Sequence, residues 1–422
     1  MHRSQPSCAW RGPIALLYFN AGGGHRAAAY ALKTELEHQY PDWPVVLVDL
    51  FAVLDPQRRF KRLTGFAPEA YYNKRLSTGF TLGLKQELKI LQAMIRFAHP
   101  RLVRKLVRYW QVMKPCLVVS LVPNFNRAIG ASLESYRLDL PETLIPELVT
   151  VMTDLADYPP HFWVEPAYTG HLICGTQRAY AQALAQGLPA HRVHCVSGMV
   201  LSSRFYRSPT DDVQVGDRLS RARAREALGF TPEQAVGCVM FGGHGSAVMR
   251  QIALLLVDRP LILLCGRNDA LKRRLQRLTT NAPHVVVGFT DDVAYWMQLA
   301  DYFIGKPGPG SISEALHCGL PVIVTRNAWT MPQERFNTDW VADHHLGQVV
   351  TGVAQMSQAV TNVTANLAQY RAAVGQLDNR ALFEVVDLLA WLCAPRGFHG
   401  TQREPLITTN KTEESLGKPS FV

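Results

Sequence analysis

The sequence predicts an α/β protein with two doubly wound parallel sheets in tandem. Short apolar runs of strand length alternate with helical patterns, as in sheets whose strands are joined by crossover helices. The alternation starts again after a polar, Arg-rich stretch at 202–225, and a glycine-rich turn follows the first strand of each series. The length of 422 residues suits two domains of this kind.

Twelve strands are expected, six in each series. Those of the first series are Ile14–Phe19, Val45–Leu50, Leu117–Leu121, Leu148–Met152, His171–Cys174 and Val193–Val196. Those of the second are Val236–Phe241, Leu261–Cys265, Val285–Val287, Tyr302–Ile304, Pro321–Thr325 and Gln348–Val350. We therefore expect a first domain at 1–200 and a second at 201–393, whose last helices could cross back to the first domain. The polar segment 394–422 has little to bury, which predicts a disordered tail.

Composition excludes several classes of protein. Hydrophobic residues make up 47% and charged residues 18% of the chain, as in folded globular proteins. No apolar run reaches the roughly 18 residues that a membrane span needs, and the first residues do not form a secretory signal, so we expect a cytoplasmic protein. The eight cysteines occur singly, without CxxC spacing, which favours free thiols and no metal site.

The positive charge is concentrated in the first half, where residues 1–200 carry +8 of the net +10. Within it, segment 85–114 combines eight Lys or Arg residues with apolar residues spaced by three and four, which predicts an amphipathic helix broken at Pro100. Such a helix can lie on an anionic membrane, bind nucleic acid phosphates, or pack on a core with a solvated basic side.

The first glycine motif, Asn20–Ala27, follows a strand and opens a helix. It fits G-x-G-x-x-A, and Asp49 ends the next strand, so a dinucleotide-binding fingerprint is nearly satisfied. Glycine turns of this kind are common, however, in doubly wound proteins of every function. His25, at the helix start, distinguishes the alternatives, because the helix dipole favours a neutral imidazole that can accept a proton. The other interpretation of His25 is a capping or packing residue.

Two further glycine motifs follow strands of the second series. Phe241–Ser246 offers backbone N–H groups to a phosphate at the start of a helix. Gly305–Pro321 is longer: its glycines let a diphosphate approach Ser311, and Glu314, one turn into the helix, can accept hydrogen bonds from ribose hydroxyls. Neither half contains the Walker pattern, which disfavours a P-loop phosphoryl transferase.

Gly305–Pro321, together with Gly22–His25, Cys265–Asn268, Gly288–Val293 and Pro332–Glu334, resembles the monogalactosyldiacylglycerol synthase family. That family is related to the processive diacylglycerol glucosyltransferases and to the lipid-linked N-acetylglucosaminyltransferase of peptidoglycan synthesis. The resemblance runs from about residue 14 to about residue 392. It implies a GT-B fold, with an acceptor-binding first domain and a nucleotide-sugar-binding second domain, and transfer with inversion and without a metal or other cofactor.

The resemblance also implies which residues bind the donor, a UDP-sugar. The diphosphate is expected near Gly243, Ser246 and Ser311, the uracil beside Phe289 and the ribose on Glu314. The remaining donor-binding candidates are Gln333 and Glu334 for the sugar hydroxyls, and Arg267 and the helix start at Gly310 for the departing diphosphate.

His25 is then the candidate base or acceptor-positioning residue. Asp154, after a strand, is a second candidate base, with helix capping as the alternative. Gly23 and Gly24 are expected at the acceptor. A lipid acceptor gives the basic helix a purpose, because a protein without an anchor must reach it at an anionic membrane surface. The expected membrane patch is Arg101, Arg104, Lys105 and Arg108, on one helical face.

The sequence thus favours a peripheral enzyme of the inner face of the cell membrane. It would transfer galactose or glucose from a UDP-sugar to diacylglycerol, without binding nucleic acid. Three alternatives remain: the same reaction on a polyprenyl-linked or other acceptor, a UDP-sugar epimerase, and a non-catalytic lipid-binding protein.

Overall fold

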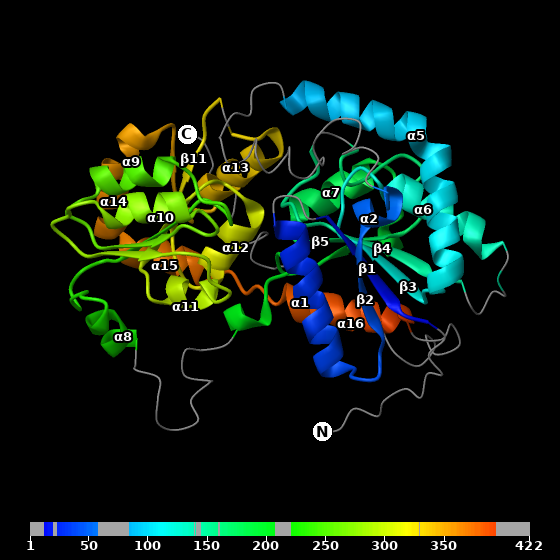
Figure 1. Cartoon of the computed structure of the whole chain (residues 1–422), viewed down its shortest axis with the longest axis horizontal. Coiled ribbons are helices and arrows are strands. Elements are labelled where there is room, and N and C mark those ends of the chain that lie inside the picture. Colours follow the sequence, from blue (N-terminus) through cyan, green and yellow to red (C-terminus); the bar gives the residue numbers. More distant parts are fainter. Residues whose placement is uncertain are drawn as a thin grey trace, which may run out of the picture. The chain divides into compact units, whose positions relative to one another are not determined.

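A computed structural model of the chain contains two compact units (Figure 1). Unit 1 comprises Met1–Ala70, Lys85–Ser202 and Arg380–Val422, and unit 2 comprises Tyr71–Leu84 and Ser203–Asn379. The structure describes residues 12–19, 23–57, 84–138, 140, 145–158, 161–206, 221–328 and 330–393.

Unit 1 contains a six-stranded parallel sheet in the order β2-β1-β3-β4-β5-β6. Its strands are β1 (Ile14–Tyr18), β2 (Val45–Asp49), β3 (Leu117–Ser120), β4 (Glu147–Val151), β5 (His171–Cys174) and β6 (Val193–Cys195). Strands β1 and β3 are almost entirely buried, which explains why they read as continuous apolar runs without alternation.

Helices connect these strands. They are α1 (Gly24–Gln39), α2 (Leu50–Leu54), α5 (Leu84–Met113), α6 (Asn126–Arg137) and α7 (Gln177–Ala185), with a 3₁₀ turn, η2 (Ala190–Arg192), before β6. The last helix, α16 (Ala381–Cys393), belongs to unit 1 and lies beside α1 (Figure 1). The carboxylate of Glu384 in α16 accepts hydrogen bonds from the backbone N–H and the hydroxyl of Ser197, at 2.7 and 2.9 Å.

The predicted break at Pro100 is wrong, because α5 continues through this residue to Met113. Pro100 lacks the N–H that would bond to the carbonyl of Arg96, and in Figure 1 the α5 ribbon changes direction along its length. Burial of the following turns outweighs the lost hydrogen bond: Trp110 is fully buried, and its indole N–H donates to the hydroxyl of Ser132 at 2.8 Å.

Unit 2 repeats the design with a parallel sheet in the order β12-β11-β10-β7-β8-β9. Its strands are β7 (Gly237–Met240), β8 (Leu261–Leu264), β9 (His284–Val287), β10 (Tyr302–Gly305), β11 (Val322–Thr325) and β12 (Gly347–Val350).

In unit 2 a helix follows each of the six strands of the sheet. In chain order the helices of this unit are α8 (Arg221–Ala227), α9 (Val248–Leu255), α10 (Asp269–Gln276), α11 (Val293–Gln298), α12 (Pro309–His317), α13 (Arg335–Asp343), α14 (Met356–Ala365) and α15 (Leu367–Val374). Short 3₁₀ turns are η3 (Ser203–Tyr206), η4 (Pro332–Glu334) and η5 (Val353–Gln355).

All twelve predicted strands are present in the two sheets, with ends that differ by one residue at most. The expected domain boundary lies between residues 200 and 201, and the two units divide between Ser202 and Ser203. The expected tail at 394–422 lies outside the described residues. The seven cysteines in the described part of the chain are free. No helix there has the length and apolar character of a membrane span.

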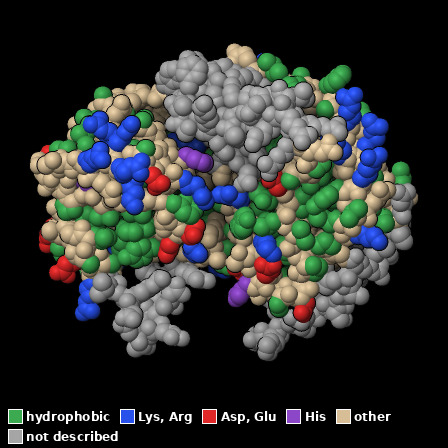
Figure 2. All heavy atoms as spheres, in the orientation of Figure 1, with side chains coloured by type: hydrophobic (Ala, Val, Ile, Leu, Met, Phe, Trp, Pro, Cys, Tyr) green, Lys and Arg blue, Asp and Glu red, His purple; other side chains and the backbone are tan. Residues whose placement is uncertain are grey.

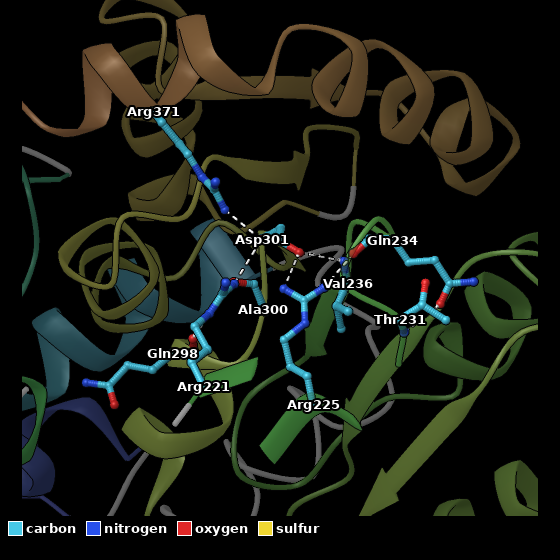
Figure 3. Close-up of polar contacts among 9 residues, drawn as sticks. All are labelled: Arg221, Arg225, Thr231, Gln234, Val236, Gln298, Ala300, Asp301 and Arg371. Atoms are coloured by element: carbon cyan, nitrogen blue, oxygen red, sulfur yellow. Dashed lines mark hydrogen bonds and ion pairs between the residues drawn. The ribbon is translucent and has the colours of Figure 1, made fainter. Parts of the chain in front are cut away.

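The polar, Arg-rich stretch before the second sheet is partly tied to that sheet by Asp301 (Figure 3). One oxygen of the Asp301 carboxylate pairs with Arg221 at 2.9 Å and Arg371 at 2.7 Å, and the other pairs with Arg225 at 2.9 Å and accepts the N–H of Val236 at 2.8 Å. Burial alone would raise the pKa of Asp301, but these hydrogen bonds and cations outweigh burial and lower it.

We predict that Asp301→Asn destabilises unit 2, because it leaves the buried Arg225 without a counter-charge. The expected loss is about 3 kcal/mol, or roughly 6–12 °C in Tm at pH 7. The lowered pKa means that the carboxylate contributes its stability above about pH 4 and loses it as the pH falls further, so wild type and variant converge in acid. Thermal unfolding with Asp343→Asn as an exposed control measures this, and equal Tm values at pH 7 would contradict it.

Candidate functional site

His25 lies where the strand order of the unit 1 sheet reverses. The chain runs from β1 outward to β2, then returns to the other side of β1 with β3, so the loops after β1 and β3 diverge at the carboxyl ends of these strands. His25 is the second residue of α1, directly after the loop that follows β1. Gly22 and the two residues before it lie outside the described residues.

The His25 imidazole has specific polar and aromatic neighbours. Its Nδ1 is 2.8 Å from the hydroxyl of Thr153, which follows β4, and a second hydrogen bond involves the backbone of Leu121, which follows β3. The rings of Phe19 and Trp163 lie beside it, with centroids at 6.5 and 6.0 Å. These groups fix the plane of the ring at the reversal of the sheet.

Burial lowers the pKa of His25 to about 4, against a smaller opposing effect of the hydrogen bond to Leu121. The imidazole is therefore neutral at pH 7 and able to accept a proton, as the sequence predicts. Removal from water is the largest cause of this lowered pKa.

Asp154 acts on the same region through Trp163. Its carboxylate accepts a hydrogen bond from the indole N–H of Trp163 at 2.9 Å, and Trp163 borders His25. Asp154 lies in a bend after β4 and precedes no helix, so helix capping is ruled out as its role. The sequence did not single out Trp163 or the bond from Thr153, because tertiary folding alone brings residues 25, 153 and 163 together.

Gly23 and Gly24 form the exposed start of α1. Gly23 has φ +91°, which favours glycine, and a Cβ on either residue would have no atom within 4 Å. The backbone N–H groups of this first turn have no intrahelical acceptor, so the open surface here can receive an oxygen of a bound molecule. Asp49, the residue that a dinucleotide fingerprint would assign to ribose, instead caps α2 with bonds to the N–H groups of Phe51 and Ala52 at 3.0 and 3.3 Å.

Unit 2 has its own reversal, between β7 and β10. Loop 241–247 follows β7 and the segment 306–308 follows β10, so the two glycine motifs predicted to bind phosphate leave adjacent strands at the same edge. Gly243 is exposed, with open space around its Cα, and Ser246 accepts the N–H of Val248 at 3.4 Å just before α9.

The loop after β8 contacts loop 241–247 closely. The N–H of Arg267 donates to the carbonyl of Gly243 at 2.9 Å, and a Cβ on Gly266 would lie 2.3 Å from that oxygen. Gly266 also has φ +58°, so this approach requires glycine. The Arg267 guanidinium stacks 4.0 Å from the centre of the Phe289 ring, whose residue is 51% exposed. The structure thus joins two of the predicted donor-binding residues in one exposed cation–aromatic pair.

Helix α12 begins at Pro309, one residue before the predicted start at Gly310. Proline has no N–H, and the first intrahelical bond runs from Ile312 to Gly308 at 3.1 Å, so the N–H groups of Gly310 and Ser311 have no acceptor within the helix. A Cβ on Gly310 would meet nothing within 4 Å. Both amides are therefore available to an anion at this helix start.

Glu314 lies one turn further along α12. Its carboxyl group makes no hydrogen bond or ion pair with any described residue, and burial raises its pKa to about 7. The thiols of Cys238 and Cys318 lie close enough for the carboxylate charge to raise their pKa values further. A partly buried acceptor without a partner is suited to bind the hydroxyl groups of a ligand.

Gln333 and Glu334 form the short turn η4 before α13. Gln333 is half-buried, whereas Glu334 is buried and pairs with Lys306, with 2.9 Å between Nζ and Oε1. Lys306 was not among the predicted site residues, although it stands inside the Gly305–Pro321 motif. Its position directly after a strand, beside glycines, was the available signal.

The predicted membrane patch is exposed. Arg101, Arg104, Lys105 and Arg108 lie on one side of α5, where Figure 2 shows Lys and Arg side chains gathered. Lys105 also donates to the carbonyl of Leu54 at the end of α2. The preceding turns expose large apolar side chains instead: Ile90, Leu91, Met94 and Phe97, the last being 84% exposed.

Part of unit 2 matches a known protein family. Residues 239–337, which include both glycine motifs of unit 2, match the glycosyltransferase family 28 C-terminal domain. The chain is similar to a probable monogalactosyldiacylglycerol synthase 2, chloroplastic, of Oryza sativa (26% identity, 94% of this chain, 82% of the relative). It is also similar to monogalactosyldiacylglycerol synthase 1, chloroplastic, of Arabidopsis thaliana (25% identity, 83% of this chain, 64% of the relative).

The predicted resemblance is confirmed. The chain is similar to the monogalactosyldiacylglycerol synthases, and glycosyl transfer is the class of activity that these matches support.

Solved structures confirm the GT-B fold. MurG of Acinetobacter baumannii matches with a TM-score of 0.53 at 13% identity, over 90% of this chain and 100% of that chain. A UDP-GlcNAc 2-epimerase from Neisseria meningitidis matches with a TM-score of 0.54 at 12% identity, over 90% and 99% of the two chains. At these identities the likeness concerns the fold, which transferases and epimerases share.

We predict that Glu314→Gln stabilises the protein increasingly as the pH rises. A folded pKa near 7 lies above the usual value of 4.5, so the carboxyl group favours folding most below pH 4.5 and loses that contribution as the pH passes through 7. The variant should therefore gain about 1–3 kcal/mol relative to wild type between pH 5 and pH 8. Thermal unfolding across this range measures the gain. Glu233→Gln, at an exposed position, is the control, and a pH-independent difference for Glu314→Gln would contradict the assignment.

Proposed function

We propose that the protein transfers galactose or glucose from a UDP-sugar to diacylglycerol at a membrane surface, with inversion at the anomeric carbon. The similarity to proteins named monogalactosyldiacylglycerol synthases, along 94% of this chain for the rice relative, carries this proposal. The geometry supplies two matching parts: a neutral imidazole in unit 1 and a set of anion-binding groups in unit 2.

In this reaction the hydroxyl oxygen of the acceptor forms a bond to the anomeric carbon. The bond from that carbon to the diphosphate oxygen breaks, and UDP leaves with the electron pair. The hydroxyl proton becomes acidic only as the new bond forms, so the neutral imidazole of His25 can accept it at that stage. Thr153 and Trp163 hold the ring in place for this transfer, and Asp154 holds Trp163.

UDP is assigned to the reversal of the unit 2 sheet. The N–H groups of Gly310 and Ser311 face the diphosphate together with loop 241–247, and the charge that develops on the departing phosphate is stabilised there. Glu314 accepts the ribose hydroxyls, which gives its unpaired carboxyl group a partner. The uracil is placed at the exposed pair of Arg267 and Phe289, because both groups stack well on a planar base.

The alternative of an epimerase shares the fold. It differs in its product, since an epimerase converts a UDP-sugar without an acceptor. The curated relatives of this chain are named as synthases, which favours transfer.

We predict that His25→Ala lowers turnover by at least about 10²-fold while the Kd for UDP stays within about twofold of wild type. The purified protein is incubated with labelled UDP-galactose or UDP-glucose and diacylglycerol vesicles, and glycolipid formation is measured. His38→Ala, at an exposed position near the end of the same helix, is the matched control and should keep full turnover.

Three outcomes would count against this proposal. Retained turnover in His25→Ala returns that residue to a packing role. Conversion of the UDP-sugar without glycolipid identifies an epimerase. Glycolipid formed only when polyprenyl-linked acceptors replace diacylglycerol overturns the choice of acceptor.

Helix α5 is assigned to the membrane. Ile90, Met94 and Phe97 are spaced by four and three, so they share one face, and all three are more than half exposed. Exposed arginines follow along the same helix at 101, 104 and 108. An apolar patch next to cations on one helix is typical of segments that lie in the interface of an anionic bilayer.

We predict that reversing Arg101, Arg104 and Arg108 to Glu lowers binding to anionic vesicles by at least about 10²-fold, because each cation contributes about 1 kcal/mol near such a surface and each Glu is repelled. Lys105 is kept, since it contacts α2. The matched control reverses Arg273, Arg274 and Arg277, which are exposed on and just after α10. Vesicle flotation measures binding, and equal losses in both triple variants would show that net charge alone, not α5, attracts the protein to the membrane.

A further inference from the structure

Lys306 and Glu334 form an ion pair that the roles proposed so far leave unexplained. Lys306 follows β10 directly, and Glu334 ends the turn η4 before α13. The Lys306 ammonium lies 2.9 Å from the Glu334 carboxylate; the lysine side chain is 33% exposed, and that of the glutamate only 6%. One partner is thus anchored in the protein, while the other reaches solvent.

The side-chain stem of Lys306, which belongs to the second glycine motif of unit 2, also lies close to the first. Its Cε lies 3.8 Å from the position that a Cβ on Gly242 would occupy and 3.3 Å from that of a Cβ on Gly308. Gly242 belongs to loop 241–247, and Gly308 precedes the first residue of α12. The ammonium group of Lys306 therefore lies near the start of α12, where the N–H groups of Gly310 and Ser311 have no acceptor within the helix.

We propose that Lys306 binds the diphosphate of the nucleotide sugar and that Glu334 balances the charge of its ammonium group until the donor arrives. This inference rests on the proposed function, which places a nucleoside diphosphate at these loops. An ammonium group has three hydrogen-bond donors, of which Glu334 occupies one, so two remain for phosphate oxygens.

The ion pair predicts the direction in which loss of each partner changes the affinity for UDP. Loss of Lys306 removes an attractive charge from the phosphate site. Loss of the Glu334 charge removes a carboxylate that repels phosphate and that neutralises Lys306. A diphosphate-binding lysine therefore predicts opposite effects of the two changes on UDP affinity, whereas a purely structural ion pair predicts the same effect for both.

The test measures the Kd values for UDP and for uridine with wild type, Lys306→Met, Lys306→Arg and Glu334→Gln. We expect Lys306→Met to weaken UDP about 10- to 100-fold and uridine less than about twofold, since uridine has no phosphate. Lys306→Arg should restore part of the UDP affinity, because it restores the charge. Glu334→Gln should bind UDP as tightly as wild type or more tightly. Lys89→Met, at an exposed position in unit 1, is the control for loss of a positive charge.

The outcomes separate this inference from the function on which it rests. If wild type binds neither UDP nor uridine, the proposed function fails and the assignment of Lys306 fails with it. If wild type binds UDP but Lys306→Met leaves that affinity unchanged, only the Lys306 assignment is overturned. Equal losses of UDP and uridine affinity in Lys306→Met, or a parallel loss of UDP affinity in Glu334→Gln, would show that the pair only supports the fold.

Discussion

The reversal of strand order in each parallel sheet is the constraint on which both candidate sites depend. Parallel strands bring all their carboxyl ends to one edge, and at a reversal the two connecting chains leave in opposite directions, which keeps side chains from filling the space between them. His25 occupies this place in unit 1, and the glycine loops predicted to bind phosphate occupy it in unit 2. Both candidate sites thus lie at the equivalent position of their sheets.

The two sites use buried groups in contrasting ways. His25 and Glu314 are both partly removed from water, and burial favours the neutral form of each: the imidazole loses its proton and the carboxyl group tends to keep it. Lys306 and Glu334 instead form an ion pair, with 2.9 Å between the ammonium and the carboxylate. An uncharged base and a pre-positioned cation are what a reaction needs when a proton leaves one reactant and negative charge accumulates on another.

Sequence patterns predicted the fold well, because strand burial and glycine turns are local signals. The twelve strands followed from the apolar runs, and the GT-B fold followed from the family resemblance, of which Gly305–Pro321 is the longest motif. Contacts between distant segments were not predictable: Trp163 beside His25, Lys306 on Glu334, and three arginines on Asp301. The uninterrupted helix through Pro100 was missed for a related reason, since the burial that tolerates it comes from the surrounding fold.

The return of the last helix to unit 1 affects the order in which the protein can fold during synthesis. Unit 1 lacks the complete α16 until residue 393 has been made. Until α16 forms, α1 packs only on β1, β2 and other parts of unit 1, and the polar groups of Ser197 lack the Glu384 carboxylate. Unit 2, by contrast, has all its strands once Val350 is made. The third arginine that pairs with Asp301, Arg371, follows soon after. The half of the molecule that is synthesised first is therefore the half completed last, and truncation at the carboxyl end would damage the amino-terminal unit.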